Sequence, residues 1–537
     1  MSPSSRDKSR RRVRGPDRQS RAQRALHVLL GPHALFTGVL VVLFFGIGLA
    51  GLMQHEMWRD EFESWLIARD SPSLPDVFRT MRYAGHPALW HTLLYFICRV
   101  TRDPFAMQLF HLLIATGTVY VLLRFSPFSR LQKALFMFGY FPLFEYCLIS
   151  RNYGMGVLFL FCVCALFPVR RRRYLGLACV LFLLAQVTVH SLIIGLALAA
   201  VLVAEAAFRK DVRATLRARR GDIIVSAVIV LAGVSVSIVQ LWPPPDSGFA
   251  VSWQTAFDAG GVRDTLTAVW RSYVPFPAIE HQFWNSNIVA GPSWQALFSV
   301  VLLVLAALCF SRRPLALFLY VLGTVGLLAF SYVKYSGFLR HHGHLYVLFV
   351  ACLWLAPHFP ARASKAGLLG KLPDAVGRYR NAFFVSLLGV QAIAGVVAVG
   401  YDWRHPFSAG KQVAAFIKEQ GLDGTLIVAD SDYAAQAVVG YLDQQVYYPR
   451  SGRFGTFVVW NASRRGLHHW QVVEKAQQLS AERGEPVLLV LNYGMTRPPE
   501  GIVELGRFGD TIVANERYWL FLVRPDRARS SPPAVDE

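Results

Sequence analysis

The chain has 537 residues, of which 54% are hydrophobic and only 17% are charged, and its mean hydropathy is +0.36. A soluble protein normally carries about 25% charged residues, so this composition excludes an ordinary soluble enzyme and predicts a polytopic membrane protein. The net charge of +21 does not indicate a nucleic-acid partner, because Arg and Lys stand in short clusters between apolar runs, where such residues set the topology.

The N-terminal segment 1–25 is polar and rich in arginine, so we expect a disordered basic tail on the cytoplasmic side. The apolar run that follows, 34–53, is long enough to span a bilayer, and no small-residue cleavage site follows it, so it is not a cleavable signal peptide. Within a transmembrane region that we place at 26–400, the sequence predicts about eleven transmembrane helices, at 34–53, 105–124, 131–149, 153–168, 174–189, 191–208, 223–241, 293–310, 314–333, 343–358 and 381–400.

One further apolar segment, 86–100, is ambiguous because it is short and contains two histidines and an arginine. If it does not cross the membrane, the four arginines Arg170 to Arg173 and the basic block 209–220 both face the cytoplasm. If it does cross, both face outward, against the positive-inside rule. We therefore predict an interfacial helix at 86–100, a cytoplasmic N-terminus and a C-terminus outside.

Two long loops then lie on the outer face, 54–104 and 242–292. The second is rich in proline and aromatic residues ("LWPPPDSGF", "SYVPFPAIEHQFW"), so we expect an ordered lid or pocket wall there.

From Tyr401 the composition becomes that of a soluble domain. The segments "GTLIVAD", "TFVVW", "PVLLVLNYG" and "RYWLFLVR" predict strands, and "SAGKQVAAFIKEQG" and "HHWQVVEKAQQLSAERG" predict helices that end at glycine. Alternating strands and helices predict an α/β domain over 401–525, followed by a disordered tail at 526–537. The domain contains no GxGxxG or P-loop motif.

Charged residues gather on the predicted outer face. Asp60 and Glu61 directly follow the first span, where a carboxylate is costly unless it is solvated or used. Arg151 stands in a tight turn between two apolar helices, either as a snorkelling cap or as part of a site. A second outer turn, "KYSGFLRHHGHLY", carries the cationic or titratable residues Lys334, Arg340, His341, His342 and His344. Cations here oppose the positive-inside bias, so we expect them to bind an anion, with phosphate the preferred choice.

Two other interpretations of the histidines stay open. They are structural, or, together with His86 and His91, they form a divalent metal site. No H-x-x-x-H pair occurs among them, and the seven cysteines lie in apolar segments without a CxxC pair. The sequence therefore predicts no defined metal site, although a divalent metal stays possible.

Acids beside cations on the outer face suit the transfer of a group from a lipid-linked phosphate. The lipid phosphate is a good leaving group that needs positive charge more than a proton, and an incoming hydroxyl needs a carboxylate to accept its proton.

The motifs "WRDEFESWLIA" and "GHPALWHTLL" resemble the first outer loop of GT-C-type glycosyltransferases, the polyprenyl-phosphate-sugar-dependent superfamily that includes protein O-mannosyltransferases and aminoarabinose transferases. The turn "SRNYGM" resembles that family's turn between its third and fourth spans. The resemblance covers about residues 50–210, extends more loosely to 358, and departs from the family at Ala88, where a second proline is usual.

The resemblance implies an α-helical GT-C-like membrane fold in a bacterial inner membrane and an inverting sugar transfer on the periplasmic face. Asp60 would be the catalytic base, and Glu61 would support it or contact the acceptor. His86 would order the loop or touch the donor, and Arg151 and Tyr153 would line the donor side. Charge placement, rather than the motifs, assigns the donor phosphate to Arg340 with His341, His342 or Lys334.

The implied partners are a polyprenyl-phosphate-linked sugar, membrane lipids, and a glycan, lipid or protein acceptor. The main alternative is a transporter or flippase for a lipid-linked or anionic solute. Such a protein should place charges near the middle of the bilayer and show repeats or broken helices, whereas here the spans are nearly free of charge. A non-catalytic scaffold is a third alternative, but it would be expected to lose the acid pair.

Overall fold

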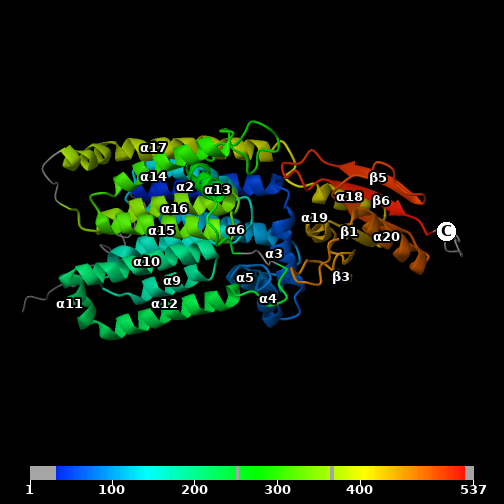
Figure 1. Cartoon of the computed structure of the whole chain (residues 1–537), viewed down its shortest axis with the longest axis horizontal. Helices are drawn as coiled ribbons and strands as arrows, with labels where there is room; N and C mark the ends of the chain where they lie inside the picture. The colour runs from blue at the N-terminus through cyan, green and yellow to red at the C-terminus, as the bar shows by residue number, and fades with distance from the viewer. Residues whose placement is uncertain (1–31, 171, 249–252, 363–367, 526–537) are drawn as a thin grey trace, which may run out of the picture.

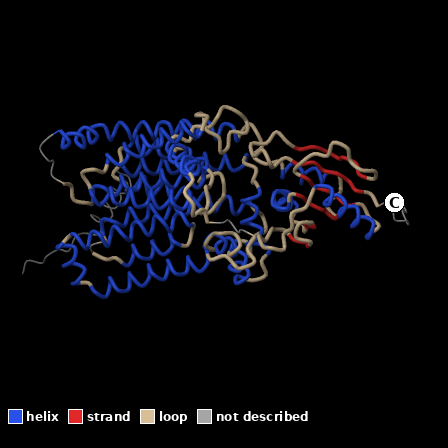
Figure 2. The backbone as a smooth tube through the Cα atoms, viewed as in Figure 1, coloured by secondary structure: helices blue, strands red, loops and turns tan. Residues whose placement is uncertain are grey.

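The computed structural model describes residues 32–170, 172–248, 253–362 and 368–525. The predicted tails, 1–25 and 526–537, lie outside the described residues. A bundle of helices makes up one part of the molecule, and a small domain that contains the β-strands stands at one end of the bundle (Figure 1, Figure 2). The predicted fold class, a helical membrane protein with a C-terminal α/β domain, is confirmed.

Seven helices in the described part of the chain are long and apolar enough to cross a membrane. They match seven of the eleven predicted spans and are α2 (Pro32–Gln54), α6 (Phe105–Phe125), α10 (Val189–Phe208), α12 (Arg220–Leu241), α14 (Pro292–Cys309), α15 (Pro314–Val333) and the second part of α17 (Leu368–Asp402).

The other four predicted spans are shorter. Three of them are α8 (Tyr153–Leu166), α9 (Leu175–Ala185) and α16 (Leu339–Leu355). Every residue of α16 is buried, and from Leu345 onward the helix is apolar on all sides, as expected of a helix enclosed by other helices.

The prediction of a single helix at the fourth span, 131–149, was wrong. This segment divides into α7 (Arg130–Met137) and the π-helical turn η1 (Tyr140–Glu145). Pro142 lies inside the turn and has no N–H to continue an α-helix.

The loop predicted at 54–104 folds into three short helices, α3 (Arg59–Asp70), α4 (Leu74–Met81) and α5 (Leu89–Ile97). The nine residues of α5 are too few to cross a membrane. The three helices lie between the bundle and the strand-containing domain (Figure 1).

The described part of loop 242–292 contains α13 (Ala259–Tyr273), whose N-terminus is capped by the Asp258 carboxylate. This loop is therefore ordered over these residues, as its aromatic content predicts.

The C-terminal domain is a six-stranded sheet in the order β3-β2-β1-β4-β6-β5. β1 is parallel to β2 and β4, and the outer pairs are antiparallel. The strands are β1 (Leu426–Asp430), β2 (Val446–Tyr448), β3 (Arg453–Gly455), β4 (Val487–Leu491), β5 (Ile502–Phe508) and β6 (Tyr518–Val523), and the helices are α18 (Gly410–Glu419), α19 (Asp432–Leu442) and α20 (His469–Arg483).

Alternate residues of the central strands face opposite layers. Ile427 and Ala429 of β1 pack in the cluster that contains α18 and α19, and Val428 packs in the cluster that contains α20. The α18–α19 cluster also includes Phe62 of α3, so this short helix is shared between bundle and domain. A Cβ at Gly440 of α19 would lie 1.9 Å from the Phe62 ring, so the close approach of the two helices requires glycine.

One predicted strand, "TFVVW", was wrong. Its polar atoms make contacts outside the sheet: the Thr456 hydroxyl donates to Asp70 (2.7 Å) and Trp460 Nε1 donates to Glu63 (3.0 Å). Both acceptors are on α3, so this segment attaches the domain to the loop that carries the predicted acids.

Candidate functional site

Asp60 lies in the first turn of α3, where a carboxylate is favoured by the exposed N–H groups of the helix start. Its carboxylate meets three arginines: Arg340 Nη2 at 3.1 Å, Arg59 Nε at 3.8 Å and Arg151 Nη1 at 4.0 Å. Arg151 also donates to the backbone oxygen of Asp60. Arg151 comes from the turn before α8 and Arg340 from the first turn of α16, so three separate segments converge. We call Arg59, Asp60, Arg151 and Arg340 the Asp60 site.

The Asp60 carboxyl is ionised at neutral pH. Burial alone would raise its pKa, but Arg151, Arg340 and Arg59 together outweigh that effect and hold the pKa below its ordinary value. The side chain remains 22% exposed, which leaves it within reach of a ligand.

Three buried nitrogen atoms in or next to the Asp60 site have no hydrogen-bond partner among the described residues. They are Nε of Arg151, Nε of Arg340 and Nδ1 of His86. Buried polar atoms are nearly always hydrogen-bonded in folded proteins, so unpaired atoms around one carboxylate indicate a place for a ligand. The two unpaired guanidinium donors favour an anion.

Aromatic rings surround the Arg340 guanidinium. Its central carbon lies 5.2 Å from the ring centre of Trp58, 5.5 Å from that of Trp284 and 4.8 Å from that of Phe338. Such cation–π contacts orient the planar group and keep water away from it. The surroundings of Arg340 are therefore partly desolvated. An electrostatic interaction with its guanidinium is stronger there than the same interaction in water.

Glu61 points into the protein and is fully buried. It accepts hydrogen bonds from the backbone N–H groups of Ser150 (2.6 Å) and Trp58 (3.2 Å) and from His55 Nε2 (3.2 Å). These contacts fix the start of α3 against the turn that carries Arg151. They favour the supporting role of Glu61 and leave its carboxylate no access to an acceptor.

His55 was missed by sequence reasoning. Its ring is buried between two carboxylates, with Nδ1 3.0 Å from Asp402 at the end of α17 and Nε2 3.2 Å from Glu61. Burial would lower the pKa of His55, but the two acids raise it to about 10, so the ring is an imidazolium. Nothing in the sequence pairs residue 55 with residue 402.

His86 and Tyr153 lie next to the arginines. Burial, Arg151 and Arg340 lower the pKa of His86 to about 3, so its ring is neutral. The His86 ring centre is 6.2 Å from that of Tyr153. The Tyr153 hydroxyl is 2.9 Å from Nε2 of His341, whose Nδ1 accepts from the Phe338 N–H. The proton of the neutral His341 ring therefore lies on Nε2, which donates to Tyr153.

Two of the predicted phosphate-binding residues make other contacts. His342 Nε2 hydrogen-bonds the backbone oxygen of Ser336 (2.9 Å), which holds the turn before α16. The Lys334 ammonium lies 5.1 Å from the ring centre of Trp253. The structure thus gathers Asp60, Arg151 and Arg340, places His86, Tyr153 and His341 beside them, and gives Lys334 and His342 structural contacts.

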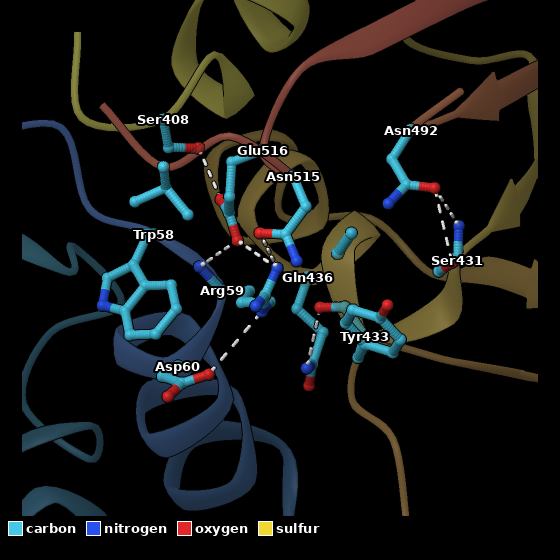
Figure 3. A network of polar contacts seen from close by, with 12 residues as sticks. Trp58, Arg59, Asp60, Ser408, Ser431, Tyr433, Gln436, Asn492, Asn515 and Glu516 are labelled. Carbon is cyan, nitrogen blue, oxygen red and sulfur yellow. Dashed lines mark hydrogen bonds and ion pairs between the residues drawn. The ribbon is translucent and has the colours of Figure 1, made fainter. Parts of the chain in front are cut away.

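The α/β domain also reaches the site, through Arg59 (Figure 3). The Arg59 N–H donates to Glu516 (3.2 Å), and Nη1 donates to Asn515 (2.8 Å). Its guanidinium also lies 5.0 Å from the ring centre of Tyr433. Burial raises the pKa of Glu516 to about 7, although Arg59 opposes this. The contacts hold Arg59 between the domain and Asp60.

No group of three or more His, Cys, Asp or Glu in the described ranges is arranged to hold a metal ion. The His190 ring stacks on that of His344, with ring centres 5.0 Å apart, and lies tilted against that of His341, with ring centres 5.3 Å apart.

No family model matches the sequence, and no curated protein matches it. Two solved structures are similar in overall arrangement. One is ArnT from Cupriavidus metallidurans bound to undecaprenyl phosphate, with a TM-score of 0.49 and 11% identity over 92% of this chain and 99% of that one. The other is the same protein in the apo state, with a TM-score of 0.47 and 12% identity over 93% and 98%.

Proposed function

We propose that this chain is a membrane glycosyltransferase that moves a sugar from a polyprenyl-phosphate donor to an acceptor hydroxyl at the Asp60 site. The observation that supports this most is the pairing of one accessible carboxylate with two buried arginines that each keep an unpaired Nε. The loop motifs "WRDEFESWLIA" and "GHPALWHTLL" point to the same chemistry.

Donor binding follows from the charges. Arg59 lies between Asp60 and Glu516, with its Nη1 3.4 Å from the Glu516 carboxyl. The guanidiniums of Arg151 and Arg340 share the single charge of Asp60. A phosphate oxygen bound to their unpaired Nε atoms would balance this excess. The leaving polyprenyl phosphate carries more negative charge than the bound donor, so these arginines stabilise the transition state more than the ground state.

Asp60 acts as the general base. The acceptor oxygen bonds to the anomeric carbon, the bond from that carbon to the phosphate oxygen breaks, and Asp60 takes the hydroxyl proton, with inversion at the carbon. The low pKa of Asp60 makes it a weak base while Arg340 is paired with it. A donor phosphate competes for Arg340 and Arg151, which raises the basicity of Asp60 when the donor is in place.

The other residues position these groups. Glu61 and His55 fix the start of α3, and the neutral ring of His86 offers a hydrogen bond to the donor. Tyr153 and His341 form the wall beside it.

We place the protein in a bacterial inner membrane, with the N-terminus cytoplasmic and the α/β domain on the outer face. The site lies at the bundle end that carries this domain, so it would open to the outer leaflet.

The test is a transfer assay. The purified full chain is given labelled polyprenyl-phosphate sugars and a panel of glycan, lipid and protein acceptors, and sugar transfer and polyprenyl phosphate release are measured for the wild type, Asp60→Asn and the control Asp76→Asn. We expect Asp60→Asn to lose about 10²- to 10⁴-fold in rate, while the control keeps the wild-type rate. Equal rates in all three proteins refute Asp60 as the base. Movement of the labelled lipid between leaflets without transfer indicates a flippase instead.

A further inference from the structure

A second cluster of charged residues lies at the end of the bundle opposite the α/β domain, near α11 (Lys210–Ala218) (Figure 1). A cavity of about 340 Å³ opens there between the start of α9 and the start of α12. Its lining residues are Arg172, Arg173, Leu175, Arg219, Gly221, Asp222 and Val225.

The arginines of this cavity have no acid partner within the part of the chain that the structure describes. Arg170 and Arg209, at the same end, both pair with Glu205. In contrast, Arg172, Arg173 and Arg219 are exposed, and no carboxylate pairs with them. Arg219 is held in place because its guanidinium donates to the backbone oxygen of Arg172.

The single acid of the cavity is already used. Asp222 accepts from the backbone N–H groups of Tyr174 (2.7 Å) and Leu175 (3.3 Å) and so caps the start of α9. The cavity therefore carries an excess of positive charge, and its ligand should be an anion.

An apolar surface continues from the cavity along α12. Ile224, Val225, Val228 and Leu231 are 63%, 50%, 59% and 64% exposed. Ile224, Val228 and Leu231 recur at helical spacing, so they share one face of α12. A free phosphate would have no use for such a surface, whereas an acyl chain attached to the phosphate would pack on it.

We infer that this cavity binds the phosphate headgroup of an anionic phospholipid, with its acyl chains along α12. The three arginines supply the charge, and Gly221, which has open space where a Cβ would stand, leaves the mouth clear. This lipid site is separate from the Asp60 site and does not depend on the proposed sugar transfer.

The experiment measures retained lipid by native mass spectrometry of the full chain in detergent, with phosphatidylglycerol and phosphatidylcholine of identical acyl chains. The wild type should retain phosphatidylglycerol preferentially. One arginine near an anionic lipid contributes roughly fivefold in affinity, so Arg172→Gln/Arg173→Gln/Arg219→Gln should lose ~10-fold or more of that preference. Gly221→Phe, which keeps every charge, should lose it as well by filling the mouth.

The matched control Lys210→Gln/Arg213→Gln/Arg217→Gln removes the same charge from α11, outside the cavity, and should keep the preference. Thermal unfolding of each variant separates loss of binding from loss of folding. An equal loss in the control, or equal retention of the two lipids by the wild type, overturns the inference. Displacement of phosphatidylglycerol by millimolar inorganic phosphate shows a site for soluble anions and overturns the lipid assignment.

Discussion

The two ends of the helical bundle use arginine in opposite ways. At the α/β-domain end, Arg151 and Arg340 are buried and face the carboxylate of Asp60. At the other end, Arg172, Arg173 and Arg219 are exposed and pair with no acid of the described residues. Both sets stand between apolar runs of the sequence. We therefore propose that burial and a facing carboxylate, rather than charge itself, distinguish an arginine that takes part in chemistry from one that sets the topology or contacts lipid.

The buried charges need further support that the exposed ones do not. At the α/β-domain end, Glu61, His55 and Asp402 form a chain of ion pairs that joins the end of α2, the start of α3 and the end of α17. Breaking a buried ion pair by removing one partner costs about 3–5 kcal/mol, because the other charge stays buried and unpaired. The precision of the Asp60 site therefore depends on residues that contact no ligand.

The largest effect that would test this comparison of the two bundle ends is expected at Arg340. We expect Arg340→Gln to reduce kcat/KM for the donor by about 10²- to 10³-fold, because a preorganised donor that faces the leaving charge is lost. Arg340→Lys should recover part of this loss, since it restores the charge but not the planar group. Steady-state kinetics with varied donor checks both. Lys334→Gln, in the segment between α15 and α16, is the control, and an equal loss there would contradict the special role of Arg340.

A second prediction concerns the buried ion pairs. His55→Gln should lower the free energy of unfolding by about 3 kcal/mol, because Glu61 and Asp402 are left as buried charges without a cation. Chemical or thermal unfolding of the purified protein measures this. His281→Gln is the control, since His281 is partly exposed and lies near Asp510. If the two variants are equally stable, the His55 contacts contribute nothing to the fold.

A third prediction is a loss of stability on the alkaline side. The folded-state pKa of His55 is about 10, above its ordinary value of 6.5. Its stabilising contribution is therefore complete below pH 6.5 and declines as the pH rises towards 10. Melting temperatures should fall across this window in the wild type and change less in His55→Gln. Parallel curves would show that another group controls the alkaline loss.

The smallest effect is expected at the opposite end of the bundle. Lys210→Gln/Arg213→Gln/Arg217→Gln removes three charges far from the Asp60 site, and exposed charges beyond about 10 Å are largely screened. The rate of sugar transfer should stay within about twofold of the wild-type rate, in the assay used for Asp60→Asn. A tenfold loss would show that the two ends are coupled.

The placement of Asp60 and Arg340 at one end of the bundle can be predicted from the sequence, because the basic residues of the loops set the topology by a simple rule. Alternation of spans and the positive-inside rule predicted that Asp60 and Arg340 share one end of the bundle, and their side chains are 3.1 Å apart. The predicted α/β domain is also present, although "TFVVW" has strand composition and forms a loop because its polar atoms contact α3.

Other contacts in the structure could not be predicted from the sequence. Glu61 and Asp60 are adjacent, yet helix geometry turns one into the protein and leaves the other at the site. Asp402 ends an apolar helix, and nothing in its surroundings in sequence indicates His55 as its partner. His342 and Lys334 are residue types that can bind a phosphate. In the structure, however, His342 contacts the backbone oxygen of Ser336 and Lys334 contacts the Trp253 ring.

The most direct test of the central claim is an experimental structure of the full chain with polyprenyl phosphate bound. We expect a phosphate oxygen within hydrogen-bonding distance of Arg340 and Arg151, in contact with their Nε atoms, and a longer separation between Asp60 and Arg340 than the 3.1 Å seen here. A phosphate bound elsewhere, with the Asp60–Arg340 pair unchanged, would contradict the account.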